Sequence, residues 1–385
     1  MTIPTIYASP RSWRSCHDPS RRCCGRRRPR ICPAVHLTSR ALLLTPSRGR
    51  GGGIERYVET LEWAFTDQGV EYRRIDLLRP GAGAHARLLG QGRNHLRASG
   101  APTRLVLAHR TLLPVASLLA RERSVRGISV VCHGSDVWAT RPRVRRRVEN
   151  RLLRRPSVRV VAVSSYTAGA LASGGPACVL PPGLSGRWFR MLVSASEGAQ
   201  RSGFRLNLLT AFRLADWRAK GLPELLAALA SLGRPDLCLT ICGNGDPPPD
   251  LVDLIRAYPW CALRVGLSDR ELAAQFAAAD LFVLATRTKP GRRACGEGFG
   301  LVLLEAQVAG TPVVGPAYGG AHDAYLDGVT GVAPVDESAA ALARTLAELL
   351  SDPRRLAHMG RRAAEWAREC CDSQTYPPRA VSRLL

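Results

Sequence analysis

Two glutamates flank a pair of glycines in the stretch Glu297-Gly298-Phe299-Gly300, which leads to Glu305. The run that follows the glycines has helical periodicity, so Gly298 and Gly300 lie where a helix begins. Free backbone N–H groups and the positive end of the helix dipole favour an anion at this point. Glu305 lies little more than one turn further on and is close enough to reach a sugar hydroxyl. This arrangement indicates a nucleotide-sugar site more than a nucleotide-hydrolysis site, although a surface glutamate and ordinary turn glycines have the same spacing.

Two cations and an amide occupy similar positions earlier in the chain. Arg213 ends a predicted strand and Lys220 opens the next helix, so both could meet a pyrophosphate at one helix N-terminus. Asn244 ends the following strand in a glycine-rich turn suited to the flat edge of a base. Because the carboxyl ends of parallel strands share one edge of a sheet, these residues and the glutamates are expected to line a single site. Taken separately, Arg213 and Lys220 are equally compatible with solvated charge.

The first half of the chain has weaker signals of the same kind. A buried strand at 41–45 is followed by a glycine-rich turn that contains Gly52 and Gly53, and then by an amphipathic helix. No Lys-Ser/Thr follows the glycines, so the turn is not a phosphate-binding P-loop, and it is also compatible with a tight turn that needs positive φ. Further on, His133 and Asp136 come directly after the predicted strand 128–132, where α/β sheets place their ligands.

Strands and helices alternate in both halves, which predicts an α/β fold with parallel, doubly wound sheets. A loss of periodicity divides the chain, so we expect two Rossmann-like domains that face each other across a cleft. The predicted segments are a disordered basic extension at 1–40, an acceptor-side domain at 41–185, a linker at 186–203, a nucleotide-sugar-binding domain at 204–365 and a C-terminal helix or tail at 366–385.

Composition narrows the classes of protein. No apolar run reaches the ~18 residues that a membrane span needs, and no secretory signal is recognisable. Twelve cysteines occur without a C-x-x-C pair, which predicts reduced thiols in a cytoplasm. The net charge is +24 and comes almost wholly from arginine, since lysine occurs only at Lys220 and Lys289. That composition is typical of GC-rich coding. A nucleic-acid surface is the remote alternative, because aromatic residues are only 6% and do not interleave with the arginines.

These motifs together resemble the retaining glycosyltransferases of the GT-B fold, in the large bacterial family 4. The resemblance covers roughly residues 41–380. It rests on the glycine-rich first turn, the His-Gly turn at 133–134, the pair Arg213 and Lys220 with Gly221, and the two glutamates eight residues apart.

The resemblance assigns roles to these residues. It implies that Arg213 and Lys220 hold the donor diphosphate and that Glu305 binds the donor ribose. Glu297 would lie beside the transferred sugar with the amides of residues 298–300, and His133 would contact that sugar from the other domain. The full predicted set is His133, Arg213, Lys220 and Glu297 as catalytic residues, with Gly52, Gly53, Asn244, Gly298, Phe299, Gly300 and Glu305 as donor-binding residues and Asp136 on the acceptor side.

No D-x-D pair is present to hold a divalent metal, so neither a metal nor a cofactor is expected. The donor is predicted to be a nucleotide-diphosphate sugar, with UDP as the expected nucleotide. Two departures from the family pattern, Phe212 in place of a glycine and a long basic loop at 287–296, leave the sugar open.

Several longer segments, including CHGSDVW and AFRLADWRAKGLPELL, resemble the second glycosyltransferases of actinomycete aminoglycoside pathways. That resemblance implies a small acceptor containing 2-deoxystreptamine. The alternative acceptor is phosphatidylinositol or another envelope glycolipid, reached by peripheral contact with a membrane. A Leu/Trp/Arg patch near the first helix would favour the lipid, and an acidic cleft would favour the aminoglycoside.

Overall fold

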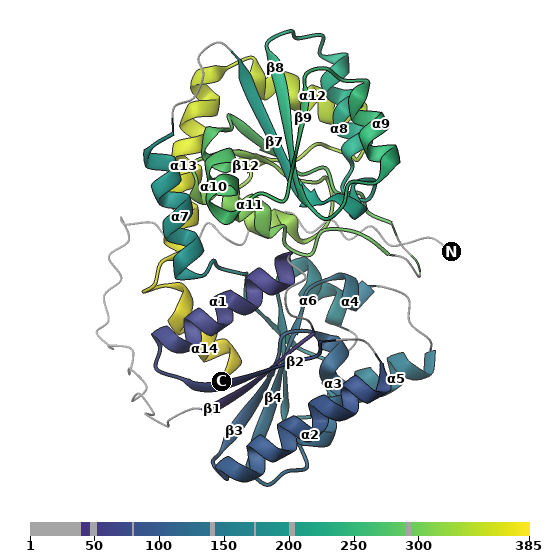
Figure 1. Cartoon of the computed structure of the whole chain (residues 1–385), viewed down its shortest axis with the longest axis vertical. Coiled ribbons are helices and arrows are strands. Elements are labelled where there is room, and N and C mark those ends of the chain that lie inside the picture. Colours follow the sequence, from purple (N-terminus) through teal and green to yellow (C-terminus); the bar gives the residue numbers. More distant parts are fainter. Residues whose placement is uncertain are drawn as a thin grey trace, which may run out of the picture. The chain divides into compact units, whose positions relative to one another are not determined.

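The computed structural model of the protein describes residues 40–46, 52–78, 81–138, 143–172, 175–199, 205–289, 291 and 294–385 (Figure 1). The predicted basic extension at 1–40 lies outside these residues except for Arg40. Much of the basic loop predicted at 287–296 is described, and its Lys289 and Cys295 pair as an isolated β-bridge.

The first sheet has six parallel strands in the order β2-β1-β3-β4-β5-β6. Its central strands are apolar on both faces, as strands covered by helices on two sides must be. Edge strand β2 differs, because charged residues alternate along it and its outward side chains meet solvent. The strands are β1 (Arg40–Thr45), β2 (Glu71–Asp76), β3 (Thr103–Leu107), β4 (Val125–Cys132), β5 (Val158–Ala162) and β6 (Ala177–Val179).

The second sheet also has six parallel strands, in the order β12-β11-β10-β7-β8-β9. Its strands are β7 (Leu206–Arg213), β8 (Leu237–Asn244), β9 (Cys261–Val265), β10 (Leu281–Val283), β11 (Val313–Val314) and β12 (Gly331–Val332). Two separate parallel sheets agree with the predicted α/β class. The domain boundaries themselves stay a prediction.

Helices connect the strands of both sheets. In the first half these are α1 (Gly53–Asp67), α2 (Ala82–Ser99), η1 (Arg110–Leu112), α3 (Leu113–Leu119), α4 (Ser135–Trp138), α5 (Arg143–Leu153) and α6 (Ser165–Leu171). In the second half they are η3 (Leu214–Asp216), α8 (Leu222–Ser231), α9 (Pro249–Arg256), α10 (Asp269–Ala278), α11 (Leu301–Val308), η4 (Gly320–Ala324), α12 (Ala339–Leu350) and α13 (Pro353–Cys371).

The segment predicted to be an irregular linker is largely helical. Helix α7 (Gly186–Glu197) buries Trp188 and Leu192 and packs against α10 and α11 of the second half. Its apolar residues recur at a helical interval that the serines and arginines between them conceal.

The last helix, α14 (Tyr376–Leu384), packs against α1 and against β5 of the first sheet. Tyr376 is fully buried and its ring stacks on Trp63 of α1, with the ring centroids 6.4 Å apart. The Ser129 hydroxyl of β4 donates to the Leu384 carbonyl oxygen at 2.6 Å. The chain therefore returns to its first sheet after completing the second.

Candidate active site

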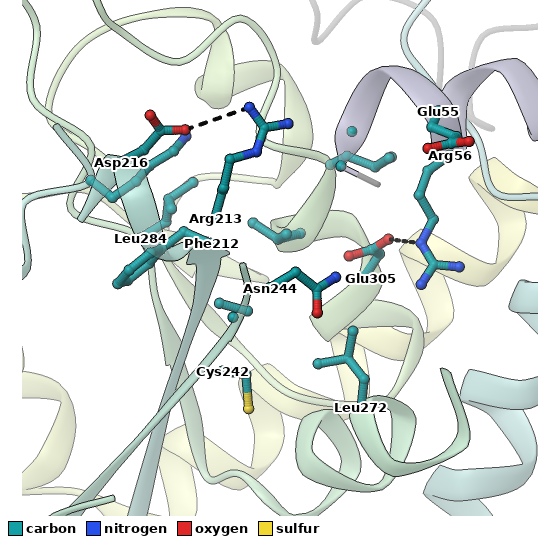
Figure 2. A pocket seen from close by; sticks show the side chains of 18 of the residues that line it. Glu55, Arg56, Phe212, Arg213, Asp216, Cys242, Asn244, Leu272, Leu284 and Glu305 are labelled. Atoms are coloured by element: carbon teal, nitrogen blue, oxygen red, sulfur yellow. Dashed lines mark ion pairs between the residues drawn. The ribbon is translucent and has the colours of Figure 1, made fainter. Parts of the chain in front are cut away.

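A cavity of about 730 Å³ lies at the carboxyl ends of the second sheet's strands, and the start of α1 contributes to its wall (Figure 2). Most of the residues predicted from sequence line it, although they come from distant segments. They are Gly52, Gly53, Arg213, Lys220, Asn244, Glu297, Gly300 and Glu305.

Lys220 and Glu297 form an ion pair in this cavity. Lys220 Nζ lies 2.9 Å from Glu297 Oε2, and the Thr286 hydroxyl donates to the same oxygen at 3.0 Å. Gly221, with φ of 70°, ends the turn that carries Lys220, and a side chain there would overlap the carbonyl oxygen of Ala285. The predicted phosphate-binding cation and the predicted sugar-binding carboxylate thus lie in direct contact. An incoming phosphate would find Lys220 already oriented.

Arg213 extends from the end of β7 toward the glycine-rich turn before α1. A Cβ built on Gly52 would lie 3.0 Å from Arg213 Nη2, so the glycine leaves room for the guanidinium. Arg213 Nη1 is 4.0 Å from Asp216 Oδ2 (Figure 2), and the Arg213 side chain is 56% exposed. At this exposure an anion can approach the guanidinium from solvent.

Asn244 ends β8 on the neighbouring strand and lines the same cavity. Gly243 precedes it, and a side chain at Gly243 would overlap Leu214 and the Phe212 carbonyl oxygen. The tight approach of η3 to β8 therefore requires glycine and sets Asn244 at the rim.

Glu305 is a buried charged residue of the cavity wall, with 4% of its surface exposed. Trp188 Nε1 donates to its Oε1 at 2.9 Å, and Arg56 Nε lies 3.8 Å from the same oxygen (Figure 2). Burial raises the pKa of Glu305, while Arg56 and Trp188 oppose that shift. The carboxylate is thus held by two side chains that sequence reasoning did not include.

The glycines before α11 permit close backbone contacts. Gly300 has φ of 78° and forms the N-cap of α11, and Phe299 is buried beneath it. A side chain at Gly298 would overlap the carbonyl oxygen of His133, so the turn before α11 lies directly against the turn after β4. A second contact between the two halves joins η4 to the start of α6, because Asp323 accepts from the backbone N–H of Ser165 at 2.6 Å.

His133 and Asp136 are brought together with each other but do not line the cavity. Asp136 Oδ1 accepts from the backbone N–H groups of His133 and Gly134 at 2.9 and 2.8 Å. The His133 ring donates from Nε2 to the Ala108 carbonyl oxygen at 2.7 Å and stacks on His109. Burial lowers the pKa of His133, against the opposing effects of Asp136 and that carbonyl, so its ring is neutral near pH 7. The predicted acceptor-side role of Asp136 stays a prediction.

Sequence reasoning missed three side chains of the site: Arg56, Trp188 and Asp269. Arg56 had one usable signal, since it follows the glycine turn at the first turn of α1. Trp188 and Asp269 gave none, because their partners lie far away in the chain.

Within the described part of the chain, no group of three or more His, Cys, Asp or Glu side chains is arranged to hold a metal ion. Metal independence of the reaction remains a prediction. None of the helices that the structure describes combines the length and apolar character needed to cross a membrane.

Comparison with known proteins places this arrangement in a family. A family model described as glycosyl transferases group 1 matches residues 208–366. The chain is 32% identical, over 83% of its length and 91% of the relative's, to the GDP-mannose-dependent alpha-(1-6)-phosphatidylinositol monomannoside mannosyltransferase of Mycolicibacterium smegmatis. It is 36% identical, over 48% of its length and 44% of the relative's, to a D-inositol 3-phosphate glycosyltransferase from an Arthrobacter species.

The fold is also that of known glycosyltransferases. Sucrose-phosphate synthase from Thermosynechococcus elongatus superposes with a TM-score of 0.73 at 18% identity, covering 89% of this chain and 98% of that one. Two Rossmann-like sheets with a site at their carboxyl ends define the GT-B architecture expected from the sequence. The chain belongs to the group 1 glycosyltransferases and is a GT-B enzyme that uses a nucleotide-sugar donor.

Proposed function

We propose that the enzyme transfers a sugar from a nucleoside diphosphate to a hydroxyl of a phosphatidylinositol-type glycolipid, with retention of configuration and without a metal ion. The proposed binding of the donor rests on one observation, the presence of two cations in one cavity. Arg213 and Lys220 line one cavity. Lys220 already forms an ion pair with Glu297, and Glu305 lies in the same wall. Two fixed cations supply the charge that other enzymes take from a metal.

The proposed reaction proceeds on one face of the sugar. The bond between the anomeric carbon and the diphosphate oxygen breaks, and the acceptor hydroxyl oxygen bonds to that carbon from the same side. The hydroxyl proton passes to the departing phosphate oxygen, which becomes part of the free nucleoside diphosphate. Arg213 and Lys220 stabilise the negative charge that grows on the diphosphate, and this is where most of the rate enhancement would arise.

Glu297 would contact the hydroxyls of the transferred sugar. Its Oε2 is already shared by Lys220 and Thr286, so its position is fixed before the donor arrives. A carboxylate held in this way orients the sugar without rearrangement during the reaction.

The names of the relatives support the glycolipid acceptor. One acts on phosphatidylinositol monomannoside and the other on inositol 3-phosphate, and both acceptors carry a cyclitol. They also widen the choice of nucleotide, because the first relative uses GDP-mannose, whereas the sequence led us to expect UDP. A peripheral protein at the cytoplasmic face of a membrane fits this proposal.

An aminoglycoside precursor is the second candidate, and the charge of the cavity favours it. Within a chain of net charge +24, the lining holds six acidic residues against the three cations Arg56, Arg213 and Lys220. The acidic residues are Glu55, Glu59, Asp216, Asp269, Glu297 and Glu305. The tryptophan of the first helix, Trp63, stacks on Tyr376 of α14.

A crossed panel of substrates tests both candidates. The purified enzyme is incubated with UDP-, GDP- and dTDP-sugars against phosphatidylinositol glycolipid in vesicles, free inositol phosphate and a 2-deoxystreptamine pseudodisaccharide, and the products are read by mass spectrometry. We expect transfer to the cyclitol lipid, unchanged by excess EDTA. Transfer to the pseudodisaccharide alone would select the second candidate, and a metal requirement would refute the metal-independent mechanism.

A further inference from the structure

Three helices from different parts of the chain meet at the Glu305 carboxylate. Arg56 lies in the first turn of α1, Trp188 in the first turn of α7 and Asp269 at the start of α10. Glu305 itself is on α11. No local spacing connects these residues, so their meeting is a product of the tertiary fold.

The contacts on Glu305 are one-sided. Trp188 Nε1 at 2.9 Å and Arg56 Nε at 3.8 Å both approach Oε1. Among the described residues, Oε2 has neither a hydrogen bond nor an ion pair. Glu305 lines the cavity. Its Oε1 is held by protein side chains, so Oε2 is the oxygen that can accept hydrogen bonds from a ligand.

The two residues that hold Oε1 are themselves held. The Arg56 guanidinium lies over the Trp188 ring, 4.3 Å from its centroid, and Arg56 Nη2 is 2.6 Å from Asp269 Oδ1. Trp188 is 2% exposed. Stacking and the second ion pair leave the guanidinium few alternative positions, which preorganises the contact with Glu305.

Burial makes this support necessary. A carboxylate removed from water loses its hydration and tends to take up a proton unless a cation or hydrogen-bond donor replaces the water. Arg56 is that cation: burial works against its charge, but Glu305 and Asp269 outweigh burial and raise its pKa. Glu305 can then remain an acceptor for two hydroxyls.

We propose that Arg56 and Trp188 are positioning residues that hold Glu305 Oε1, so that Oε2 accepts hydrogen bonds from the donor ribose. The inference rests on the proposed donor-binding role of Glu305. It also links donor affinity to the first half of the molecule, because α1 follows directly on the first strand of the first sheet. The site thereby selects ribonucleotides over 2′-deoxyribonucleotides through residues that act by holding Glu305.

The rival interpretation gives the opposite sign. If Arg56 occupied the ribose position and competed for Glu305, removing it would tighten nucleotide binding. The two interpretations are therefore separated by the direction of one measurement.

The experiment measures binding of UDP, GDP and their 2′-deoxy forms by titration calorimetry to the full-length protein. The variants are Glu305→Ala, Arg56→Ala, Arg56→Lys, Trp188→Phe and the double Arg56→Ala/Glu305→Ala. We expect Arg56→Ala to weaken binding of the preferred ribonucleotide about 10-fold, the scale of a lost supporting contact. Arg56→Lys should recover part of that affinity. Trp188→Phe keeps the ring and removes only the N–H donor, so it should weaken binding to a smaller extent.

Two further readouts exclude general damage. The preference for the ribo form over the 2′-deoxy form should fall in Arg56→Ala, and Arg56→Ala should have little added effect in the Glu305→Ala background. Arg362→Ala, an exposed arginine on α13, is the matched control and should bind like the wild type.

The outcomes separate the inference from its premise. Unchanged binding in Glu305→Ala would refute the donor role of Glu305 and with it the premise. Weakened binding in Glu305→Ala together with unchanged or tighter binding in Arg56→Ala and Trp188→Phe would overturn the inference alone. If Arg56→Ala strongly lowers the melting temperature, the nucleotide affinities of Trp188→Phe and Arg56→Lys test the inference in its place.

Discussion

The carboxyl edges of the two sheets carry polar residues in equivalent topological positions, but the residues serve different ends. At the second sheet, Arg213, Lys220 and Asn244 project into the cavity. At the first sheet, Asp136 accepts hydrogen bonds from the backbone of its own turn, and the His133 ring donates to the Ala108 carbonyl oxygen that follows β3. The same place in an α/β fold thus holds a binding surface in one half and a supported backbone in the other.

The difference follows from how the turns are built. After β7, Gly221 accommodates the sharp turn from which the Lys220 side chain reaches Glu297 in the cavity. After β4, Asp136 replaces that freedom with hydrogen bonds to two consecutive backbone N–H groups. The turn that results is rigid enough to present the His133 carbonyl against Gly298. Mutations at the edge of the second sheet are therefore expected to lower turnover, and mutations at the edge of the first sheet are expected to lower stability.

The largest effect should come from the second edge. Arg213→Ala and Lys220→Ala should each lower kcat about 10²–10³-fold, because each removes a preorganised charge facing the leaving diphosphate. The double variant should fall short of the product of the two, since both act on one group. Slower single turnovers at unchanged melting temperatures would establish the contrast. Near-normal kcat in both single variants would show that the active site lies elsewhere than in this cavity.

Gly298→Ala tests the contact between the edges. The added methyl would overlap the His133 carbonyl oxygen, so the turn before α11 must shift and carry Glu297 with it. A displacement near 1 Å in a positioned group costs up to about 10²-fold in kcat/KM. Gly90→Ala on α2, where nothing lies within 4 Å, is the control and should leave kcat/KM unchanged. Equal activity in the two variants would show that the contact has no role.

Asp136→Ala should show the character of the first edge. It leaves the His133 and Gly134 N–H groups without their carboxylate acceptor, at a cost of roughly 1–3 kcal/mol of unfolding free energy. Thermal and denaturant unfolding measure this loss, and kcat should change less than in Lys220→Ala. A large fall in kcat at constant stability would instead support the acceptor-side role predicted for Asp136.

Glu305→Gln should have a small effect, which appears as a change in how stability depends on pH. Burial raises the folded-state pKa of Glu305, with Arg56 and Trp188 opposing and Asp269 reinforcing the shift. Since the folded protein then holds the proton more tightly than the unfolded chain, this group's contribution to stability is complete below its unfolded pKa and is lost as pH rises through the folded pKa. The wild type should therefore lose stability relative to Glu305→Gln as pH rises above the ordinary pKa of a glutamate, about 4.3. Melting curves measured above that pH, with no such trend, would contradict the pKa shift.

Sequence alone predicted the class of fold and most of the second edge. Arg213 and Asn244 end strands, and Lys220, Asn244 and Glu297 stand next to turn glycines, so these local patterns are visible without a structure. The ion pair between Lys220 and Glu297 was not predictable, because it joins residues 77 apart whose separation depends on the packing of the whole sheet.

Other elements were hidden by their composition. Strand β2 alternates charged residues at an exposed edge, and α7 has serines and arginines between its buried positions. In the sequence Arg56 resembles a solvated helix charge, whereas in the structure it contacts Glu305, Asp269 and Trp188. The residues that support a site are less visible in sequence than those that line it, because their partners are long-range.

The return of α14 to the first sheet has a consequence for recombining these enzymes. Tyr376 packs between Trp63 of α1 and Gly183, and the Leu384 carbonyl oxygen accepts from Ser129 of β4, so the unit built on the first sheet is encoded by two separated stretches of the gene. A chimera made by a single crossover near residues 186–203 would pair one enzyme's first sheet with another enzyme's final helix. Exchange of the complete first-sheet unit between relatives therefore requires two crossovers, the second ahead of residue 376.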